Sequence, residues 1–178
     1  TAGVGGAIRI QNSTGLTTFD DCRFKSNSAD SAGGGCGFHN SDIDITSCSF
    51  ENNDSPLGGG IRCSGNGSTS IVDSVFCGNL TDHILGCGSG DNNAFLDECL
   101  DCNENGIVDF IDIENGTSGE CNNNSIPDGC NDDCIGDGVP DICDVLNGTS
   151  EDLNFNCSRD ECEEDCNKIG TPDDYDVY

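Results

Sequence analysis

The chain has 178 residues, with 34 acidic and only 6 basic side chains, so its net charge is −28. This charge excludes nucleic acids as partners, because their phosphate backbone would be repelled. No apolar run of about 18 residues is present, so no membrane span is expected. Aromatic residues make up only 6% of the chain, which instead contains 15 cysteines and 25 glycines. We therefore expect disulfides in place of a large apolar core, in a protein that is secreted or exposed at the cell surface.

Charge and cysteines divide the chain into two halves. Residues 1–86 contain 9 acids and 4 bases, a net charge of −5, and residues 87–178 contain 25 acids and 2 bases, a net charge of −23. A solvated tail could carry the second charge, but residues 99–166 also contain nine cysteines. We predict one domain over residues 1–86, a second over 87–168 and a C-terminal tail over 169–178.

The first half repeats with a period of 26 residues. Phe24, Phe50 and Phe76 have this spacing, and each is followed three residues later by an asparagine, namely Asn27, Asn53 and Asn79. Short alternating stretches separated by glycine and asparagine are typical of the coils of a parallel β-helix. We predict about three coils, with a phenylalanine ladder inside and a buried asparagine ladder at a corner.

The same residues resemble the repeats of polymorphic outer-membrane proteins, in which GGA[ILV] is followed by FxxN. GGAI at residues 5–8 matches fully, GGGI at 58–61 is close, and all three FxxN copies match. The resemblance covers residues 3–82 and implies a right-handed parallel β-helix of the kind found in surface and adhesive proteins. Open strand edges at the ends of such a helix could pair with another copy, so assembly into a homopolymer is one expected partnership.

Some β-helix proteins cleave polysaccharides, but this chain lacks the residues that such enzymes need. No pair of carboxylates has the spacing of a general acid and base. We therefore expect no enzymatic activity and no catalytic residues, although a fragment of a carbohydrate-active enzyme stays an alternative.

The second half repeats a pattern of acidic and amide side chains. Four copies begin at Asp101, Glu120, Asp133 and Asp152, and the middle interval is shorter than the two that flank it. Calcium takes about six to eight oxygen ligands, and a loop that supplies them at positions 1, 3, 5, 7, 9 and 12 wraps one ion. The pattern therefore predicts Ca²⁺ as the cofactor, with up to four ions bound.

The predicted ligands are side-chain oxygens, except at position 7, where the backbone carbonyl binds. Copy one supplies Asp101, Asn103, Asn105, Ile107, Asp109 and Asp112. Copy two supplies Glu120, Asn122, Asn124, Ile126, Asp128 and Asn131. Copy three supplies Asp133, Asp137, Val139, Asp141 and Asp144, and copy four supplies Asp152, Asn154, Asn156, Ser158, Asp160 and Glu163.

The copies depart from this pattern at a few positions. Gly106 and Gly138 permit the turn at position 6, whereas Ser125 and Cys157 replace the glycine in copies two and four. Ile135 has no ligand oxygen at position 3 of copy three. The alternative is a set of asparagine-rich turns without metal, but a folded segment with a charge of −23 and no counter-ion would repel itself.

This half is similar to two calcium-binding families. The loop resembles that of dockerins, and the cysteines at positions 2 and 11 resemble those of thrombospondin type 3 repeats. Copy two ends at Asn131 and copy three begins at Asp133, so these copies are back to back. This arrangement leaves no room for the dockerin helix and favours the thrombospondin type. That resemblance implies a chain wound around calcium ions and held by disulfides, with little regular structure.

The cysteines of the copies allow a simple sequential pairing. We predict Cys102–Cys121, Cys130–Cys134 and Cys143–Cys162, with Cys157–Cys166 as a further pair, although sequence alone does not fix connectivity. Cys22 and Cys48 occupy equivalent positions and are expected to stack as buried thiols.

Eight sequons for N-glycosylation occur. Asn53 and Asn79 belong to the expected ladder and should be buried, so the candidate sites are Asn12, Asn66, Asn115 and Asn147. The complete prediction is a mainly β protein with a calcium-stabilised second module. We expect it to act in cell-surface adhesion or in an extracellular fibre, with a cell-surface or matrix partner; a dockerin-like docking module is the alternative.

Overall fold

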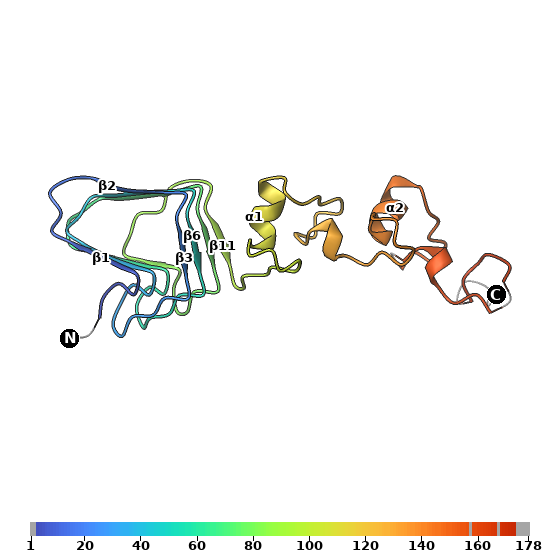
Figure 1. The fold of residues 1–178 in the computed structure, drawn as a ribbon, viewed down its shortest axis with the longest axis horizontal. Helices are drawn as coiled ribbons and strands as arrows, with labels where there is room; N and C mark the ends of the chain where they lie inside the picture. Colours follow the sequence, from blue (N-terminus) through green and yellow to red (C-terminus); the bar gives the residue numbers. More distant parts are fainter. Residues whose placement is uncertain (1–2, 157, 167, 174–178) are drawn as a thin grey trace. The chain divides into compact units, whose positions relative to one another are not determined.

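The structure is a computed structural model that describes residues 3–156, 158–166 and 168–173 (Figure 1). It divides into two compact units, of which unit 1 ends at Cys99 and unit 2 begins at Leu100. Unit 1 therefore extends beyond the predicted boundary at residue 86. The reason is a partial fourth coil, formed by strands β10 (Ile84–Leu85) and β11 (Ala94–Leu96).

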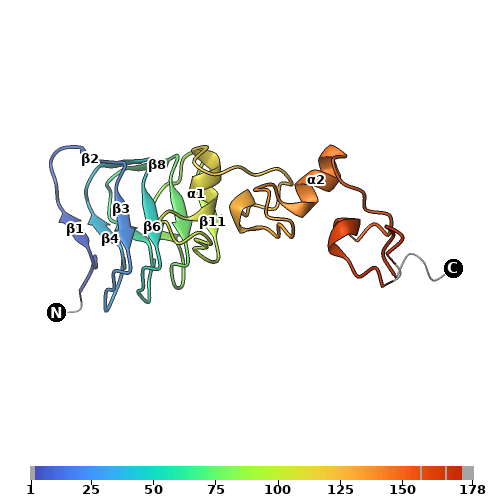
Figure 2. The same cartoon turned by 45° about the vertical axis from the view of Figure 1, so that its right-hand side comes forward.

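Unit 1 is a parallel β-helix, as predicted. In Figure 2 the strands of successive coils lie side by side, from blue to green. The three sheets have the orders β1-β4-β7-β10, β2-β5-β8 and β11-β9-β6-β3, and every strand pairing is parallel. The strands of the three complete coils are β1 (Ile8–Gln11), β2 (Thr17–Asp20), β3 (Arg23–Lys25), β4 (Cys36–His39), β5 (Ile43–Thr46), β6 (Ser49–Glu51), β7 (Ile61–Ser64), β8 (Thr69–Val72) and β9 (Val75–Cys77).

The predicted phenylalanine ladder runs through the core of unit 1. The rings of Phe24 and Phe50 stack with centroids 4.7 Å apart, and those of Phe50 and Phe76 with centroids 4.8 Å apart. Phe95 extends the ladder into the partial coil, at 5.3 Å from Phe76. Coil spacing and ring stacking thus coincide, because strands in a sheet lie about 4.8 Å apart.

The asparagine ladder is also confirmed. Asn27 Nδ2 donates to Asn53 Oδ1 at 3.0 Å, and Asn53 Nδ2 donates to Asn79 Oδ1 at 2.9 Å. The amides of Asn53 and Asn79 also donate to the backbone carbonyls of Phe24 and Phe50. Each buried amide therefore satisfies polar groups of a neighbouring coil.

Two disulfides attach the partial coil to the third coil. Cys63 is bonded to Cys87, and Cys77 to Cys99. The remaining cysteines of unit 1 are free thiols, and two of them are buried among the core side chains, Cys36 and Cys48. Burial raises the pKa of Cys48 to about 11 and raises that of Cys36 further, so both thiols stay protonated and weakly nucleophilic.

Unit 2 has little regular structure, and its buried residues are mainly charged. Its helices are α1 (Asp109–Glu114), the 3-10 helix η1 (Asp128–Cys130), α2 (Asp141–Asn147) and the 3-10 helix η2 (Asp160–Cys162). A carboxylate at position 9 of a copy begins each of these four helices. Buried carboxylates in this unit are Asp109, Asp112, Asp141, Asp144 and Asp160.

The disulfides of unit 2 follow a different rule from the predicted one. The structure pairs Cys102 with Cys130, Cys121 with Cys143, and Cys134 with Cys162. The predicted pairs Cys102–Cys121, Cys130–Cys134 and Cys143–Cys162 are therefore wrong, although all six cysteines are in disulfides. Cys157 lies outside the described residues, and Cys166 has no disulfide partner among the residues that the structure describes.

The physical reason is that each bond joins position 2 of one copy to position 11 of the next copy. Position 11 lies in the short helix, which turns its side chain towards the preceding copy. The Cys143 sulfur lies 3.8 Å from Asp128 of copy two, and the Cys162 sulfur lies 3.9 Å from Asp141 of copy three. The side chain at position 11 therefore contacts position 9 of the preceding copy. The cysteine at position 2 of that preceding copy lies beside this contact.

His83 occupies a half-buried place at the end of the ladders. Its Nδ1 lies 3.2 Å from the amide nitrogen of Asn79, and its ring contacts Phe76 and Phe95. Since an amide nitrogen donates, Nδ1 must accept, which requires that this nitrogen is unprotonated. Burial lowers the pKa of His83 below its usual value, although the charges of Asp97 and Asp82 act in the opposite direction.

Unit 1 should therefore lose stability when the pH falls below about 6.5, the ordinary pKa of histidine. As the pH falls below about 6.5, the histidine of the unfolded chain takes up a proton, whereas folded His83 does not. The contribution of neutral His83 to the stability of unit 1 is therefore present above this pH and is lost below it. Urea unfolding of wild type and H83Q, followed at about pH 7.5 and 5.5, measures the difference. H39Q is the control and should keep the pH dependence of the wild type; an identical pH dependence in H83Q contradicts the assignment.

The buried thiols should resist alkylation in the folded protein. With iodoacetamide at neutral pH, we expect label on exposed Cys166 and none on Cys36 or Cys48 until the chain is unfolded. Peptide mass mapping before and after denaturation provides the measurement. Rapid labelling of Cys36 without denaturant would show that the β-helix core opens.

Candidate metal-binding loops

A carboxylate at position 1 organises each loop. In copy one, Asp101 accepts the backbone N–H of Asn105 at 3.1 Å and that of Gly106 at 2.9 Å. Asp133 does the same in copy three for Asp137 and Gly138. The chain is thereby folded back over the first carboxylate, which brings positions 3 and 5 around it.

A second repeated contact closes each loop at position 9. The backbone N–H of position 2 donates to the position-9 carboxylate at 2.8 Å in copy one, where Cys102 donates to Asp109. The backbone N–H of Asp109 in turn donates to the carbonyl of Leu100 at 2.8 Å. Both bonds recur in copies two, three and four, at Asp128, Asp141 and Asp160.

The turns at positions 4 and 6 require left-handed backbone. Gly106 and Gly138 have φ of 88° and 89°, and Ser125 adopts φ of 64° where glycine is missing. Glycine adopts this conformation without cost, whereas a side chain strains it. Position 4 is left-handed in copies one to four, at Glu104, Asn123, Gly136 and Phe155.

Copy one brings its predicted ligands together most completely. Asp112 is fully buried, and its Oδ2 accepts the amides of Asn103 at 3.1 Å and Asn105 at 2.7 Å. The Thr117 hydroxyl, together with these two amides, holds the pKa of Asp112 below its usual range. The side chains at positions 3 and 5 thus meet the carboxylate at position 12.

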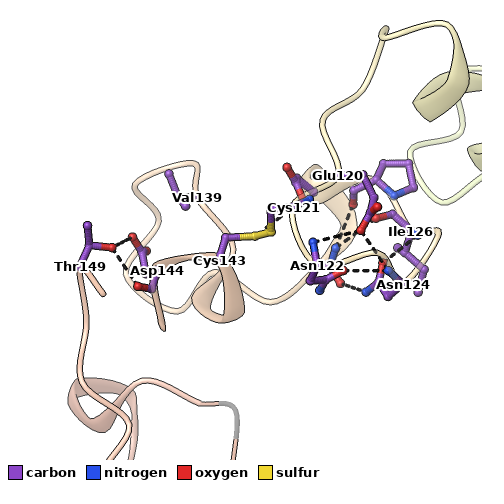
Figure 3. Close-up of a disulfide and its surroundings, with 12 residues drawn as sticks. Glu120, Cys121, Asn122, Asn124, Ile126, Val139, Cys143, Asp144 and Thr149 are labelled. Carbon is purple, nitrogen blue, oxygen red and sulfur yellow. Dashed lines mark hydrogen bonds between the residues drawn. A yellow bond between two sulfur atoms is a disulfide. The ribbon is translucent and has the colours of Figure 1, made fainter. Parts of the chain in front are cut away.

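Copy two has the same arrangement with an amide at position 12. Glu120 accepts the backbone N–H groups of Asn122 and Asn124 (Figure 3). The amide of Asn124 donates to Asn131 at 2.8 Å, and the Asn131 amide points to the carbonyl of Ile126 at 3.3 Å. The carbonyl of Ile126, which the sequence predicts as a metal ligand, therefore accepts a hydrogen bond from the Asn131 amide.

Copy four closes with a glutamate. Glu163 accepts the amides of Asn154 and Asn156, which links positions 3, 5 and 12. The second carboxylate oxygen of buried Asp160 has no hydrogen-bond partner among the residues that the structure describes. A buried carboxylate oxygen without a donor is unfavourable unless a cation is near.

Copy three differs from the others because its cluster contains a basic side chain. Asp137, Asp141 and Asp144 all lie within 4.0 Å of the guanidinium of Arg159, and Ile135 at position 3 is exposed. The Thr149 hydroxyl also donates to Asp144. The predicted ligands of this copy are thus together, but around a cation from the chain itself.

Sequence reasoning missed a fifth copy that begins at Asp165. Asp165 accepts the backbone N–H of Gly170 at 2.8 Å, and the N–H of Cys166 donates to Asp173 at 2.9 Å. The N–H of Asp173 donates to the carbonyl of Glu164 at 2.8 Å, as at every other position 9. The predicted boundary between residues 168 and 169 therefore falls inside a loop.

The spacing of the copies could have revealed the fifth copy. The starts at positions 101, 120, 133, 152 and 165 alternate between a longer and a shorter separation. The letters DCNKIG that begin at Asp165 also repeat DCNENG at the start of copy one. Ile169 at position 5 breaks the ligand pattern, which is why a search for oxygen ligands passes over this copy.

Two further clusters combine an aspartate with two sulfurs. Cys121, Asp128 and Cys143 form one, and Cys134, Asp141 and Cys162 form the other. Because both sulfur pairs are disulfides, they lack the thiolate that binds metals. The oxygen-rich loops therefore remain the candidate sites, and their ligand type is that of a hard cation such as Ca²⁺.

The candidate glycosylation sites are all accessible. Asn12, Asn66, Asn115 and Asn147 are exposed, whereas Asn53 and Asn79 are buried as predicted. Whether the exposed four carry glycans stays a prediction. The described residues contain no helix long and apolar enough to cross a membrane.

Comparisons with known proteins do not place the chain in a family. No protein-family model matches it, and no curated protein or solved structure is significantly similar to it. The interpretation of the loops therefore depends on their own geometry.

Proposed function

We propose that this chain is a secreted structural protein whose unit 2 folds around calcium ions. The main support is Asp112 in copy one: this carboxylate is fully buried, receives the side chains of positions 3 and 5, and forms no ion pair within the described part of the chain. A buried charge without a counter-ion is costly, and a divalent cation would offset that cost.

The charge of the whole unit supports the same proposal. Buried carboxylates replace an apolar core, and the unit has only two basic side chains, Arg159 and Lys168. Disulfides connect successive copies, which keeps loops close together that would otherwise repel one another. Such numbers of disulfides are typical of extracellular proteins, where free calcium is also abundant enough for weak sites.

The form of the module favours a thrombospondin-like calcium coil over a docking module. Helices α1 and α2 span Asp109–Glu114 and Asp141–Asn147, so each has fewer than two full turns. A docking helix in the manner of dockerins has no counterpart in the described residues.

Unit 1 is the part that suits adhesion or assembly. Strands β1, β2 and β3 lie at the end of their sheets and leave backbone groups for an added strand. We propose that this edge pairs with another copy or with a matrix partner, while unit 2 acts as a calcium-stiffened segment.

Calcium should bind to unit 2 with dissociation constants of about 10⁻⁴–10⁻³ M, the range of extracellular modules. Isothermal titration calorimetry of the non-reduced protein after removal of metal gives the stoichiometry. D112N, which keeps the shape of the side chain and removes its charge, should lose one bound ion. D44N, which removes an acid from β5 in unit 1, is the control and should bind as the wild type does.

Hydrogen–deuterium exchange provides an independent readout. Amides of copy one, residues 101–112, should exchange more slowly with calcium than with chelator, whereas those of unit 1 should not change. If the wild type binds no calcium at millimolar concentration and exchange is equal in both conditions, the calcium proposal is wrong.

A further inference from the structure

Position 8 of the copies holds a buried side chain, and one copy differs from the rest. Val108, Pro127, Pro140 and Pro172 are apolar and buried, whereas copy four has Arg159 at this position. Arg159 is nevertheless only 4% exposed. Arginine is rarely buried to this extent unless its charge is paired.

The guanidinium of Arg159 lies within copy three. Its Nη1 is 2.8 Å from Asp144 Oδ2, 3.7 Å from Asp141 Oδ1 and 3.9 Å from Asp137 Oδ2. These three carboxylates occupy positions 12, 9 and 5 of copy three. The positive charge of Arg159 thus lies among the predicted calcium ligands of the preceding loop.

The rest of the side chain is held on the side of copy four. Nε donates to the hydroxyl of Ser150 at 2.8 Å, and Nη2 lies 3.2 Å from Glu161 Oε1. A planar guanidinium with several fixed donors suits such a site better than a flexible amine does. The contacts on both sides fix the group between the two copies.

Copy three also has a poorer set of calcium ligands than copies one, two and four. Ile135 supplies no oxygen at position 3, and the backbone N–H of Gly136 donates to Asp133 there instead. The backbone N–H groups of Asp137 and Gly138 donate to the same carboxylate. The position-1 carboxylate of this loop therefore already has three backbone donors.

From these contacts we infer that Arg159 is the built-in cation of copy three and takes the place of a calcium ion there. A divalent cation among the same carboxylates would be repelled by the guanidinium and would have to displace it. Copies three and four are therefore joined by an ion cluster and by Cys134–Cys162, in a way that does not depend on calcium. The inference rests on the proposed function only for the number of ions bound.

The sharpest test replaces Arg159 with the residue that three other copies have at this position. R159P is compatible with the backbone, because Arg159 has φ of −75° and proline prefers about −65°. Calcium titration should show one more bound ion in R159P than in the wild type. I135N, which restores the ligand at position 3, should not add an ion by itself but should tighten the new site when combined with R159P.

The wild-type protein provides the complementary comparison. D144N should leave the calcium stoichiometry of the wild type unchanged, whereas D112N lowers it by one. Loss of an ion in D144N, or equal stoichiometry in R159P and a wild type that binds calcium, overturns the inference. Peptide mapping of Cys134–Cys162 identifies variants that have folded.

A measurement without metal separates this inference from the calcium proposal. In chelator, R159Q should speed amide exchange in residues 133–163 at least about tenfold, and exchange in copy one should not change. This result supports the inference even if the protein binds no calcium at all. Unchanged exchange in R159Q contradicts it, whatever the outcome of the calcium titrations.

Discussion

In both units, contacts between side chains of neighbouring repeats hold the repeats together, because the chain has few large apolar residues from which to build a thick core. Phe50 contacts Phe24 on one side and Phe76 on the other. In unit 2, the cysteine at position 2 meets the cysteine at position 11 of the following copy. Everything else depends on this register, since a shift by one residue would separate every such pair.

The two units fill their interiors with opposite kinds of atoms. Unit 1 buries stacked rings and amides, which are neutral and can satisfy one another through any number of coils. Unit 2 buries carboxylates, which repel one another unless a cation lies near them. Arg159 supplies that cation for copy three, so one segment can meet the same electrostatic requirement with a side chain or with an ion.

Much of unit 1 could be predicted from sequence because its signals are local and repeated. Phenylalanine and asparagine recur with the period of a coil, so both ladders follow from spacing. The fourth coil was not predicted for two reasons. Phe95 follows Phe76 more closely than the period of the earlier phenylalanines, and Glu98 replaces the asparagine of the FxxN motif. A shortened coil keeps its strand pairing but loses the period.

In unit 2 the loops were predictable and the contacts between them were not. The pattern of oxygens defines each copy by itself, whereas the direction of the position-11 side chain depends on a short helix begun by position 9. The prediction of sequential disulfides was wrong for this reason. The role of Arg159 was not predicted either, because a long side chain can place its charge in a neighbouring loop. The position of the residue in the sequence does not indicate that loop.

The staggered disulfides also determine what a single cut in the chain would do. The bridges Cys102–Cys130, Cys121–Cys143 and Cys134–Cys162 close overlapping rings, so every peptide bond between residues 102 and 162 lies inside at least one ring. The bridges Cys63–Cys87 and Cys77–Cys99 do the same for residues 63 to 99. A protease that cleaves one bond in either stretch leaves the two pieces covalently joined. Among the disulfides of the described residues, none encloses the three bonds from Cys99 to Cys102, so one nick in this segment separates the residues before it from those after it.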